Sequence, residues 1–138
     1  MIDYSKFQLS LKRLEEQHVN YRSLDSDLPP LILEGISESV IQRFETCYDC
    51  LWKILKRYLN QELGIADPPN SPKPIFRLTH ENGLLVSPQE SWFEYVQARI
   101  GTSHDYDGEK AKPCLELMSN FIDDALGLYQ TMTGATWE

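Results

Sequence analysis

Residues 99 to 106 read R-I-G-T-S-H-D-Y, in which Arg99, His104 and Tyr106 are the side chains best suited to chemistry on a phosphate. An arginine carries a permanent charge on a forked guanidinium that grips phosphate oxygens. A histidine exchanges a proton near neutral pH, and a tyrosine offers a phenolic hydroxyl. The R-x4-H-x-Y spacing therefore predicts a candidate phosphodiester site, with Arg99 and His104 as its catalytic residues.

The backbone between Arg99 and His104 must bring the two side chains together. In a continuous helix five residues turn by about 500°, which leaves the two positions roughly 140° apart around the axis. They converge only if the helix ends between them. Gly101 tolerates terminating conformations, and the hydroxyls of Thr102 and Ser103 can bond to freed backbone groups, so we expect the helix to end near Gly101.

Arg99 falls on the apolar face of its predicted helix. Trp92, Tyr95 and Val96 precede it on that face at helical spacing. The arginine is therefore expected to face inward or toward an interface, where a buried charge needs a partner.

The rest of the chain carries helical signals. Apolar residues at spacings of three and four predict helices over about residues 3–24, 31–63 and 108–133. Ser87-Pro88 with Glu90 predicts the start of another helix by a capping box, and a short helix is expected over 74–81 after a proline-rich loop. No strand-like alternation occurs. The sequence thus predicts a single all-α domain over residues 1–138, an antiparallel up-down-up-down four-helix bundle with a short extra helix.

Composition narrows the classes of partner. The formal net charge is −8, which opposes broad nucleic-acid binding, so any RNA or nucleotide contact must be local or supplied by a partner or by dimerisation. No apolar run of about 18 residues exists to span a membrane, and the N-terminal segment is unlike a signal peptide. We therefore expect a cytoplasmic protein.

Cysteine and histidine usage predicts neither a metal site nor a cofactor. Cys47 and Cys50 share a helix face, which admits a redox or metal interpretation, but no histidine lies near them in sequence to complete a zinc site. We interpret these two and Cys114 as packing residues. His18 falls on the apolar stripe of the first helix and is expected to be a core histidine.

The middle of the long second helix is the most aromatic and most mixed stretch of the chain. Glu45 and Asp49 form a like-charge pair one turn apart, which is mildly unfavourable alone. We weigh an acidic spot that faces a partner against an ordinary solvated helix face. The candidate partner- or substrate-binding residues of this stretch are Arg43, Glu45, Asp49, Trp52 and Lys53.

Three segments in order resemble a known family: F-E-T-C-Y-D-C-L-W-K-I-L-K (44–56), S-P-K-P-I-F-R (71–77) and W-F-E-Y-V-Q-A-R-I-G-T-S-H-D-Y (92–106). Together they resemble the HEPN superfamily, in its branch of nucleotidyltransferase substrate-binding proteins. The resemblance implies a homodimeric four-helix bundle that works with a separately encoded minimal nucleotidyltransferase, often as a toxin and antitoxin pair.

The resemblance also implies residue roles. In HEPN ribonucleases the arginine and histidine of both protomers line a shared cleft and cut RNA without metal. Here Arg99 would hold the scissile phosphate and His104 would act as general acid or base. Tyr106 matches the tyrosine that the partner enzyme adenylylates in some pairs, and an added nucleotide there would block RNA by bulk and repulsion.

One position departs from the ribonuclease pattern. Many active members carry a polar residue, usually asparagine, after the arginine, whereas this chain has Ile100, which cannot donate a hydrogen bond to phosphate. We therefore favour an accessory subunit that binds the nucleotidyltransferase and its substrate. The alternatives are a ribonuclease toxin neutralised by adenylylation, and a plain helical interaction domain in which Arg99 pairs with an acidic residue.

Overall fold

The computed structural model describes the backbone of residues 1–104 and 108–137, and the side chains of residues 1–102 and 111–137. Its elements are α1 (Ser5–Arg22), α2 (Pro30–Gln61), α3 (Pro72–Glu81), α4 (Gln89–His104) and α5 (Gly108–Thr133). The described chain contains no strand, so the all-α prediction is confirmed. Each predicted helix is present, and outside α4 the ends lie within about two residues of the predicted ones.

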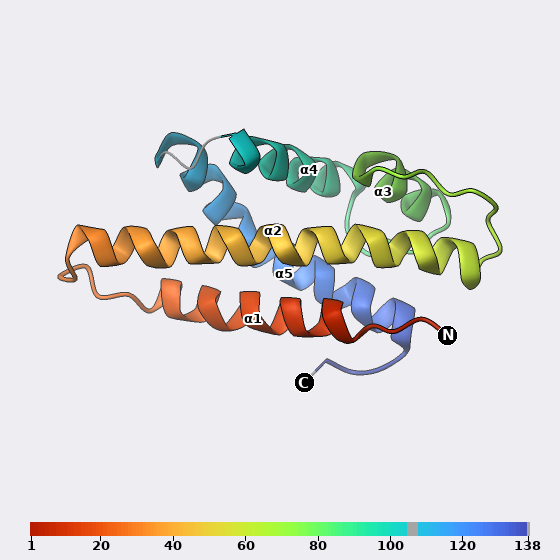
Figure 1. Ribbon diagram of the computed structural model, residues 1–138, viewed down its shortest axis with the longest axis horizontal. Helices are drawn as coiled ribbons and strands as arrows, with labels where there is room; N and C mark the ends of the chain where they lie inside the picture. Colours follow the sequence, from red (N-terminus) through yellow and green to blue (C-terminus); the bar gives the residue numbers. More distant parts are fainter. Residues whose placement is uncertain (105–107, 138) are drawn as a thin grey trace.

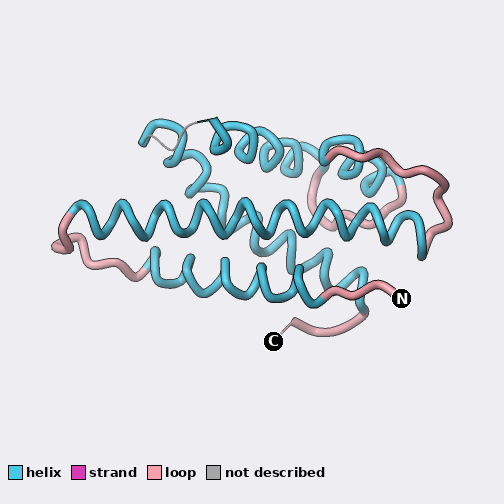
Figure 2. The backbone as a smooth tube through the Cα atoms, in the orientation of Figure 1, coloured by secondary structure: helices cyan, strands magenta, loops and turns pink. Residues whose placement is uncertain are grey.

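The helices form a bundle around α2, which contacts each of the other four. Figure 1 shows α1 along one side of α2, α3 and α4 along the other, and α5 crossing behind at an oblique angle. The predicted short extra helix is α3. It follows the long proline-containing connection at residues 62–71, which Figure 2 draws as an irregular loop beyond the end of α2.

The predicted apolar stripes form the core. Phe7, Leu11 and Leu14 of α1 are buried, and so is His18 at 6% exposure, as predicted. The His18 ring stacks on Tyr21, and burial lowers the pKa of the imidazole below its usual value. The α1 stripe therefore packs as its spacing indicates, with the histidine among its core residues.

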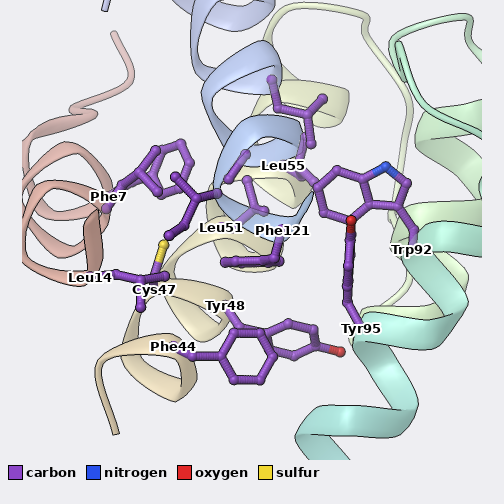
Figure 3. Close-up of a cluster of buried hydrophobic side chains, with 14 of the residues drawn as sticks. Phe7, Leu14, Phe44, Cys47, Tyr48, Leu51, Leu55, Trp92, Tyr95 and Phe121 are labelled. Carbon is purple, nitrogen blue, oxygen red and sulfur yellow. The ribbon is translucent and has the colours of Figure 1, made fainter. Parts of the chain in front are cut away.

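An aromatic cluster joins α2, α4 and α5 at the centre of the bundle (Figure 3). Phe121 of α5 is fully buried, with its ring centroid 4.9 Å from that of Phe44 and 5.2 Å from that of Tyr95, both edge to face. Trp92 of α4 contacts Tyr95 and Phe121 and stacks on Phe76 of α3. These rings fix the distance between α4 and α2, and so position every residue further along α4.

The start of α4 differs in detail from the predicted capping box. The helix begins at Gln89, and the hydroxyl of Ser87 accepts a hydrogen bond from the indole Nε1 of Trp92 at 2.8 Å. A buried indole N–H needs a partner of this kind. Ser87 thus anchors the largest core side chain, which is a different role from the predicted N-cap.

The cysteines lie where packing residues are expected. Cys47 and Cys114 are buried and Cys50 is half-buried, and all three are free thiols. Burial raises the pKa of Cys114 to about 12, which keeps this thiol protonated at neutral pH. Among the described side chains no three histidine, cysteine, aspartate or glutamate residues gather as a metal site would require. None of the described helices is long and apolar enough to cross a membrane.

Candidate functional site

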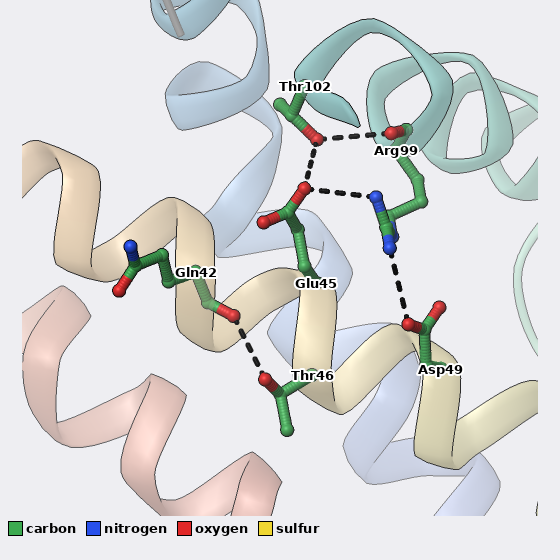
Figure 4. Close-up of polar contacts among 6 residues, drawn as sticks. All are labelled: Gln42, Glu45, Thr46, Asp49, Arg99 and Thr102. Atoms are coloured by element: carbon green, nitrogen blue, oxygen red, sulfur yellow. Dashed lines mark hydrogen bonds and ion pairs between the residues drawn. The ribbon is translucent and has the colours of Figure 1, made fainter. Parts of the chain in front are cut away.

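The centre of the candidate site is an ion-pair network between α4 and α2. Arg99 Nη1 donates to Glu45 Oε2 at 2.9 Å, and Arg99 Nη2 donates to Asp49 Oδ2 at 3.2 Å. Thr102 donates its hydroxyl to the same Glu45 oxygen at 3.0 Å. We call these four residues, drawn in Figure 4, the Arg99 cluster. The expectation that Arg99 faces inward and needs a partner is confirmed.

The network explains the like-charge pair on α2. One turn of helix separates Glu45 from Asp49, so both carboxylates project toward α4, and the guanidinium between them compensates their repulsion. In the described part of the chain these are the two ion pairs within 4.0 Å. The acidic pair is therefore neither a bare acidic spot nor an ordinary solvated face.

Burial and charge oppose each other at Arg99. Partial burial lowers the pKa of the guanidinium, but the hydrogen bond to Asp49 and the charges of Asp49 and Glu45 outweigh it, so the net pKa is raised. The side chain is 25% exposed, compared with 15% for Glu45. Arg99 Nε is buried and donates to no described atom. Both of the terminal guanidinium nitrogens are already directed at carboxylates.

The expected helix end at Gly101 is wrong. Helix α4 continues through Gly101 to His104, so positions 99 and 104 lie roughly 140° apart around the helix axis. The backbone of α4 therefore does not bring Arg99 and His104 to one face within the chain. The side chain of His104, and Tyr106 as a whole, lie outside the described residues, so their predicted roles stay predictions.

Replacing Gly101 with alanine will raise the free energy of unfolding by about 0.5–1 kcal/mol, because the glycine sits inside a helix and loses more conformational freedom than alanine does. A Cβ at this position meets no atom of the described residues within 4 Å, so no clash with them offsets the gain. Urea denaturation followed by circular dichroism measures the change.

The matched control for that substitution is Gly83→Ala. Gly83 also has open space around a Cβ, but its φ of +71° belongs to the left-handed region that alanine adopts poorly. This variant should be destabilised. A loss of stability in Gly101→Ala would contradict a continuous helix at this point.

A hollow of about 480 Å³ adjoins the Arg99 cluster, and we call it the Arg99 hollow. Trp52 and Tyr48 of α2 line it, and Ile100 of α4 forms part of its rim with a side chain 48% exposed. The other lining residues are Asp49, Ser71, Pro72, Lys73, Pro74, Val96, Gln97 and Arg99. All three segments that carry the family resemblance therefore contribute to this one surface.

Not all of the remaining candidate residues line the Arg99 hollow. Trp52 does, and Lys53 lies beside it on α2, on a neighbouring surface that includes Lys6 of α1. Arg43 is directed toward α1, where its Nη1 donates to the carbonyl oxygen of Arg13 at 2.7 Å. Arg43 therefore belongs to the contact between α1 and α2.

Thr102 is the residue of the cluster whose role the sequence did not indicate. It is 1% exposed, and its hydroxyl lies 3.0 Å from Glu45 Oε2 and 3.1 Å from the carbonyl oxygen of Arg99. The available signal was its position three residues after Arg99, which places both on one face of a helix that continues past Gly101. Because the sequence predicts a helix end at Gly101, it does not place Thr102 on the same helix face as Arg99.

Comparison with known proteins identifies relatives of the whole fold. A Haemophilus influenzae protein named "Probable ribonuclease HepT" is 28% identical over 106 residues, which cover 75% of this chain and 72% of that protein. A solved structure from the same species, described as the fold of a substrate-binding domain of a nucleotidyltransferase, superposes with a TM-score of 0.84 at 25% identity. That match covers 94% of this chain and 98% of the other.

A crystal structure of a Thermus thermophilus protein shares the fold. Its TM-score is 0.76 at 24% identity, over 92% of this chain and 98% of the other. The sequence model of the family described as "Nucleotidyltransferase substrate binding protein like" matches residues 2–134, nearly the full length of the chain. The resemblance in the three segments is therefore confirmed, and this chain belongs to the nucleotidyltransferase substrate binding protein-like family.

Proposed function

We propose that this chain is the accessory subunit of a two-component nucleotidyltransferase: it binds a separately encoded minimal nucleotidyltransferase together with that enzyme's substrate. It works as a homodimer in the cytoplasm. The family match over residues 2–134 and the likeness to a described nucleotidyltransferase substrate-binding domain support this function. The chain itself supplies a binding surface, and the transfer chemistry belongs to the partner.

The state of Arg99 is the observation that carries the proposal. Its two terminal nitrogens are directed at Glu45 and Asp49, so the positive charge that a scissile phosphate requires is already compensated. A phosphodiester would have to displace two carboxylates whose charge repels it. The arrangement favours a structural arginine at the edge of a binding surface over a catalytic arginine in an open cleft.

The Arg99 hollow is suited to an interface. Its lining combines the exposed Ile100 with Trp52 and two prolines, and it also includes the ion pair between Arg99 and Asp49. Aromatic and apolar residues beside an arginine are typical of the central part of a protein interface. We place the contact with the nucleotidyltransferase across this hollow. One of its lining residues, Ile100, is six residues before Tyr106 in the sequence.

Complex formation tests the proposal. The chain is co-expressed with a minimal nucleotidyltransferase from the same organism, and the two are analysed by size-exclusion chromatography with light scattering. We expect a stable complex that contains two copies of this chain. Ile100→Asp should weaken it at least tenfold, because an aspartate would be desolvated on the rim of the hollow. Val19→Asp, at a comparably exposed apolar residue of α1, is the control and should bind normally.

The proposal fails if the two proteins elute separately, or if both substitutions weaken the complex equally. Thermal unfolding of each variant alone separates a lost interface from a lost fold. The light-scattering mass of the isolated chain tests the dimer in the same run.

A second candidate function is a ribonuclease toxin, which the relative named as a probable ribonuclease and the R-x4-H-x-Y spacing favour. Its partner would transfer an adenylyl group: the Tyr106 hydroxyl oxygen bonds to the α-phosphorus of ATP, the bond to the β-phosphate breaks, pyrophosphate leaves, and the phenolic proton passes to solvent. Growth arrest on expressing this chain alone, relieved by His104→Ala, together with a mass gain by adenylyl units that Tyr106→Phe abolishes, would establish this function. We expect no arrest.

A further inference from the structure

The second half of α2 carries a concentration of positive charge away from the Arg99 cluster. Lys53, Lys56 and Arg57 line a hollow of about 360 Å³, within the size range of small-ligand sites. We call it the Lys56 hollow. Its other lining residues are Trp52, Asn60, Gln61, Pro68 and Asn70.

These cations are not compensated at close range. Among the described side chains, both ion pairs within 4.0 Å involve Arg99. No described carboxylate therefore lies within 4.0 Å of the charged nitrogens of Lys53, Lys56 or Arg57. Asp49 lies nearby, but its Oδ2 already accepts from Arg99. In a chain of formal net charge −8, this surface is a local reversal of sign.

The surrounding charges favour an anion. Lys6 of α1 lines the adjoining surface together with Lys53 and Arg57. The carboxylate of Asp3 lies close enough to two of these cations for them to affect its pKa. The Ser5 hydroxyl and backbone N–H lower the pKa of Asp3 most, and the charges of Lys6 and Arg57 lower it further. Among the described residues, the cations Lys6, Lys53 and Arg57 therefore share one surface with the carboxylate of Asp49, and Lys56 lies on the adjoining hollow.

Trp52 adds an aromatic wall. The side chain is half-buried and lines both the Lys56 hollow and the Arg99 hollow, so it stands at the boundary between them. Lys53 Nζ lies 5.9 Å from the centroid of the indole. An indole face beside lysines and an arginine is the combination that stacks a nucleobase and holds its phosphate.

Side chains of α2 hold in place the connection that lines part of the hollow. Lys56 Nζ donates to Asn70 Oδ1 at 3.0 Å, and Asn60 Nδ2 donates to the carbonyl oxygen of Ile65 at 3.0 Å. Both bonds tie the connection between α2 and α3 to the helix. Because the connection is already held in place, less conformational entropy is lost on ligand binding than if a flexible loop had to become ordered.

We infer that the Lys56 hollow binds a nucleoside phosphate, whose base stacks on Trp52 and whose phosphates contact Lys53, Lys56 and Arg57. This inference rests on the proposed function and names the substrate class that the subunit holds. Because Trp52 also lines the Arg99 hollow, the bound nucleotide would lie beside the surface assigned to the nucleotidyltransferase.

The test is isothermal titration calorimetry of the full chain, without its partner, at low salt. ATP and a 5′-phosphorylated single-stranded trinucleotide are the two probes, which distinguish a free nucleotide from a nucleic-acid end. The double variant Lys53→Gln with Arg57→Gln should weaken binding at least tenfold, because two charge-assisted contacts are lost while both exposed positions stay polar. Trp52→Ala should also weaken it, and Trp52→Phe should retain most of the affinity.

Lys12→Gln is the matched control. Lys12 Nζ lies 5.7 Å from the ring centroid of Trp137, the same kind of pair as Lys53 with Trp52 but outside this hollow, so its loss should leave binding unchanged. Binding of either probe with this pattern of variants supports the inference. No binding of either probe by the wild-type chain, or an equal loss in Lys12→Gln, overturns it.

The outcome is separate from that of the proposed function. Titration of the isolated chain needs no nucleotidyltransferase, whereas the proposed function is judged by complex formation. If the chain binds nucleotide but forms no complex, the accessory-subunit function is overturned and the nucleotide site at the Lys56 hollow is supported. If the chain forms the complex but binds no nucleotide, the accessory-subunit function is supported and the nucleotide site is overturned.

Discussion

Replacing Phe121 with alanine will lower the free energy of unfolding by about 3–5 kcal/mol, the range for a large side chain removed from a packed core. Phe121 is fully buried at the junction of three helices. Its ring contacts Phe44 from α2 and both Tyr95 and Trp92 from α4. The substitution leaves a cavity that no single neighbour can fill, since each ring is held by another.

Denaturation with urea, followed by circular dichroism, measures this change, and a melting temperature lower by roughly 10–20 °C is expected with it. Phe121→Leu, which retains most of the apolar volume, should lose less than half as much stability. Phe93→Ala, at a half-buried aromatic residue that lines a hollow between α4 and α5, is a second control and should also lose less. A loss below about 1 kcal/mol for Phe121→Ala would mean that the aromatic cluster does not join the helices.

Replacing Arg99 with methionine will lower the free energy of unfolding by about 2 kcal/mol. The expected value lies between the small contribution of exposed ion pairs and the roughly 3–5 kcal/mol for a broken buried pair, because Arg99 is 25% exposed and Glu45 is 15% exposed. Methionine keeps the apolar stem of the side chain. The loss therefore reports on the charge, which no longer compensates Glu45 and Asp49.

A double-mutant cycle with Glu45→Gln isolates the interaction. Because Arg99 and Glu45 are in direct contact at 2.9 Å, their effects should be non-additive by about 1–2 kcal/mol. Arg43→Met is the matched control on α2: that arginine donates to a backbone carbonyl, and its cycle with Glu45→Gln should be additive. A coupling energy near zero between Arg99 and Glu45 would contradict the network.

The two effects bear differently on function. The aromatic cluster sets the position of α4 against α2, so Phe121→Ala should weaken nucleotidyltransferase binding and nucleotide binding together. Loss of the Arg99 charge acts at the Arg99 hollow, which this residue lines. In Arg99→Met we expect nucleotide binding at the Lys56 hollow to be retained.

Local pattern was enough for the helices and most of the core. The predicted stripe of α5 is buried from Met118 to Tyr129, and the predicted inward face of α4 includes Trp92, Tyr95 and Val96. These predictions succeed because helix periodicity is a property of a short segment, and burial of one face follows from it. The family resemblance also depended on short segments, and the match over residues 2–134 bears it out.

Short-range reasoning failed at Gly101 and Ser87. Glycine predicts a helix end because it readily adopts the backbone conformations that terminate helices. The same conformational freedom also allows a helix to continue through glycine when neighbouring contacts favour it. Thr102, one residue beyond, is buried and bonded to Glu45 on α2, a contact that exists only if the helix goes on. Ser87 similarly satisfies an indole N–H five residues away.

The sequence by itself determined the helices, their buried faces and the family of this protein. Only the tertiary structure decided what those residues do together. Arg99 meets Glu45 across 54 positions of the chain, and Trp52 closes two hollows with residues from α2, α4 and the connection between α2 and α3. The physical reason is that the rotation and offset of α4 against α2 are set by interlocking aromatic rings from three helices, and no single segment's periodicity contains that information.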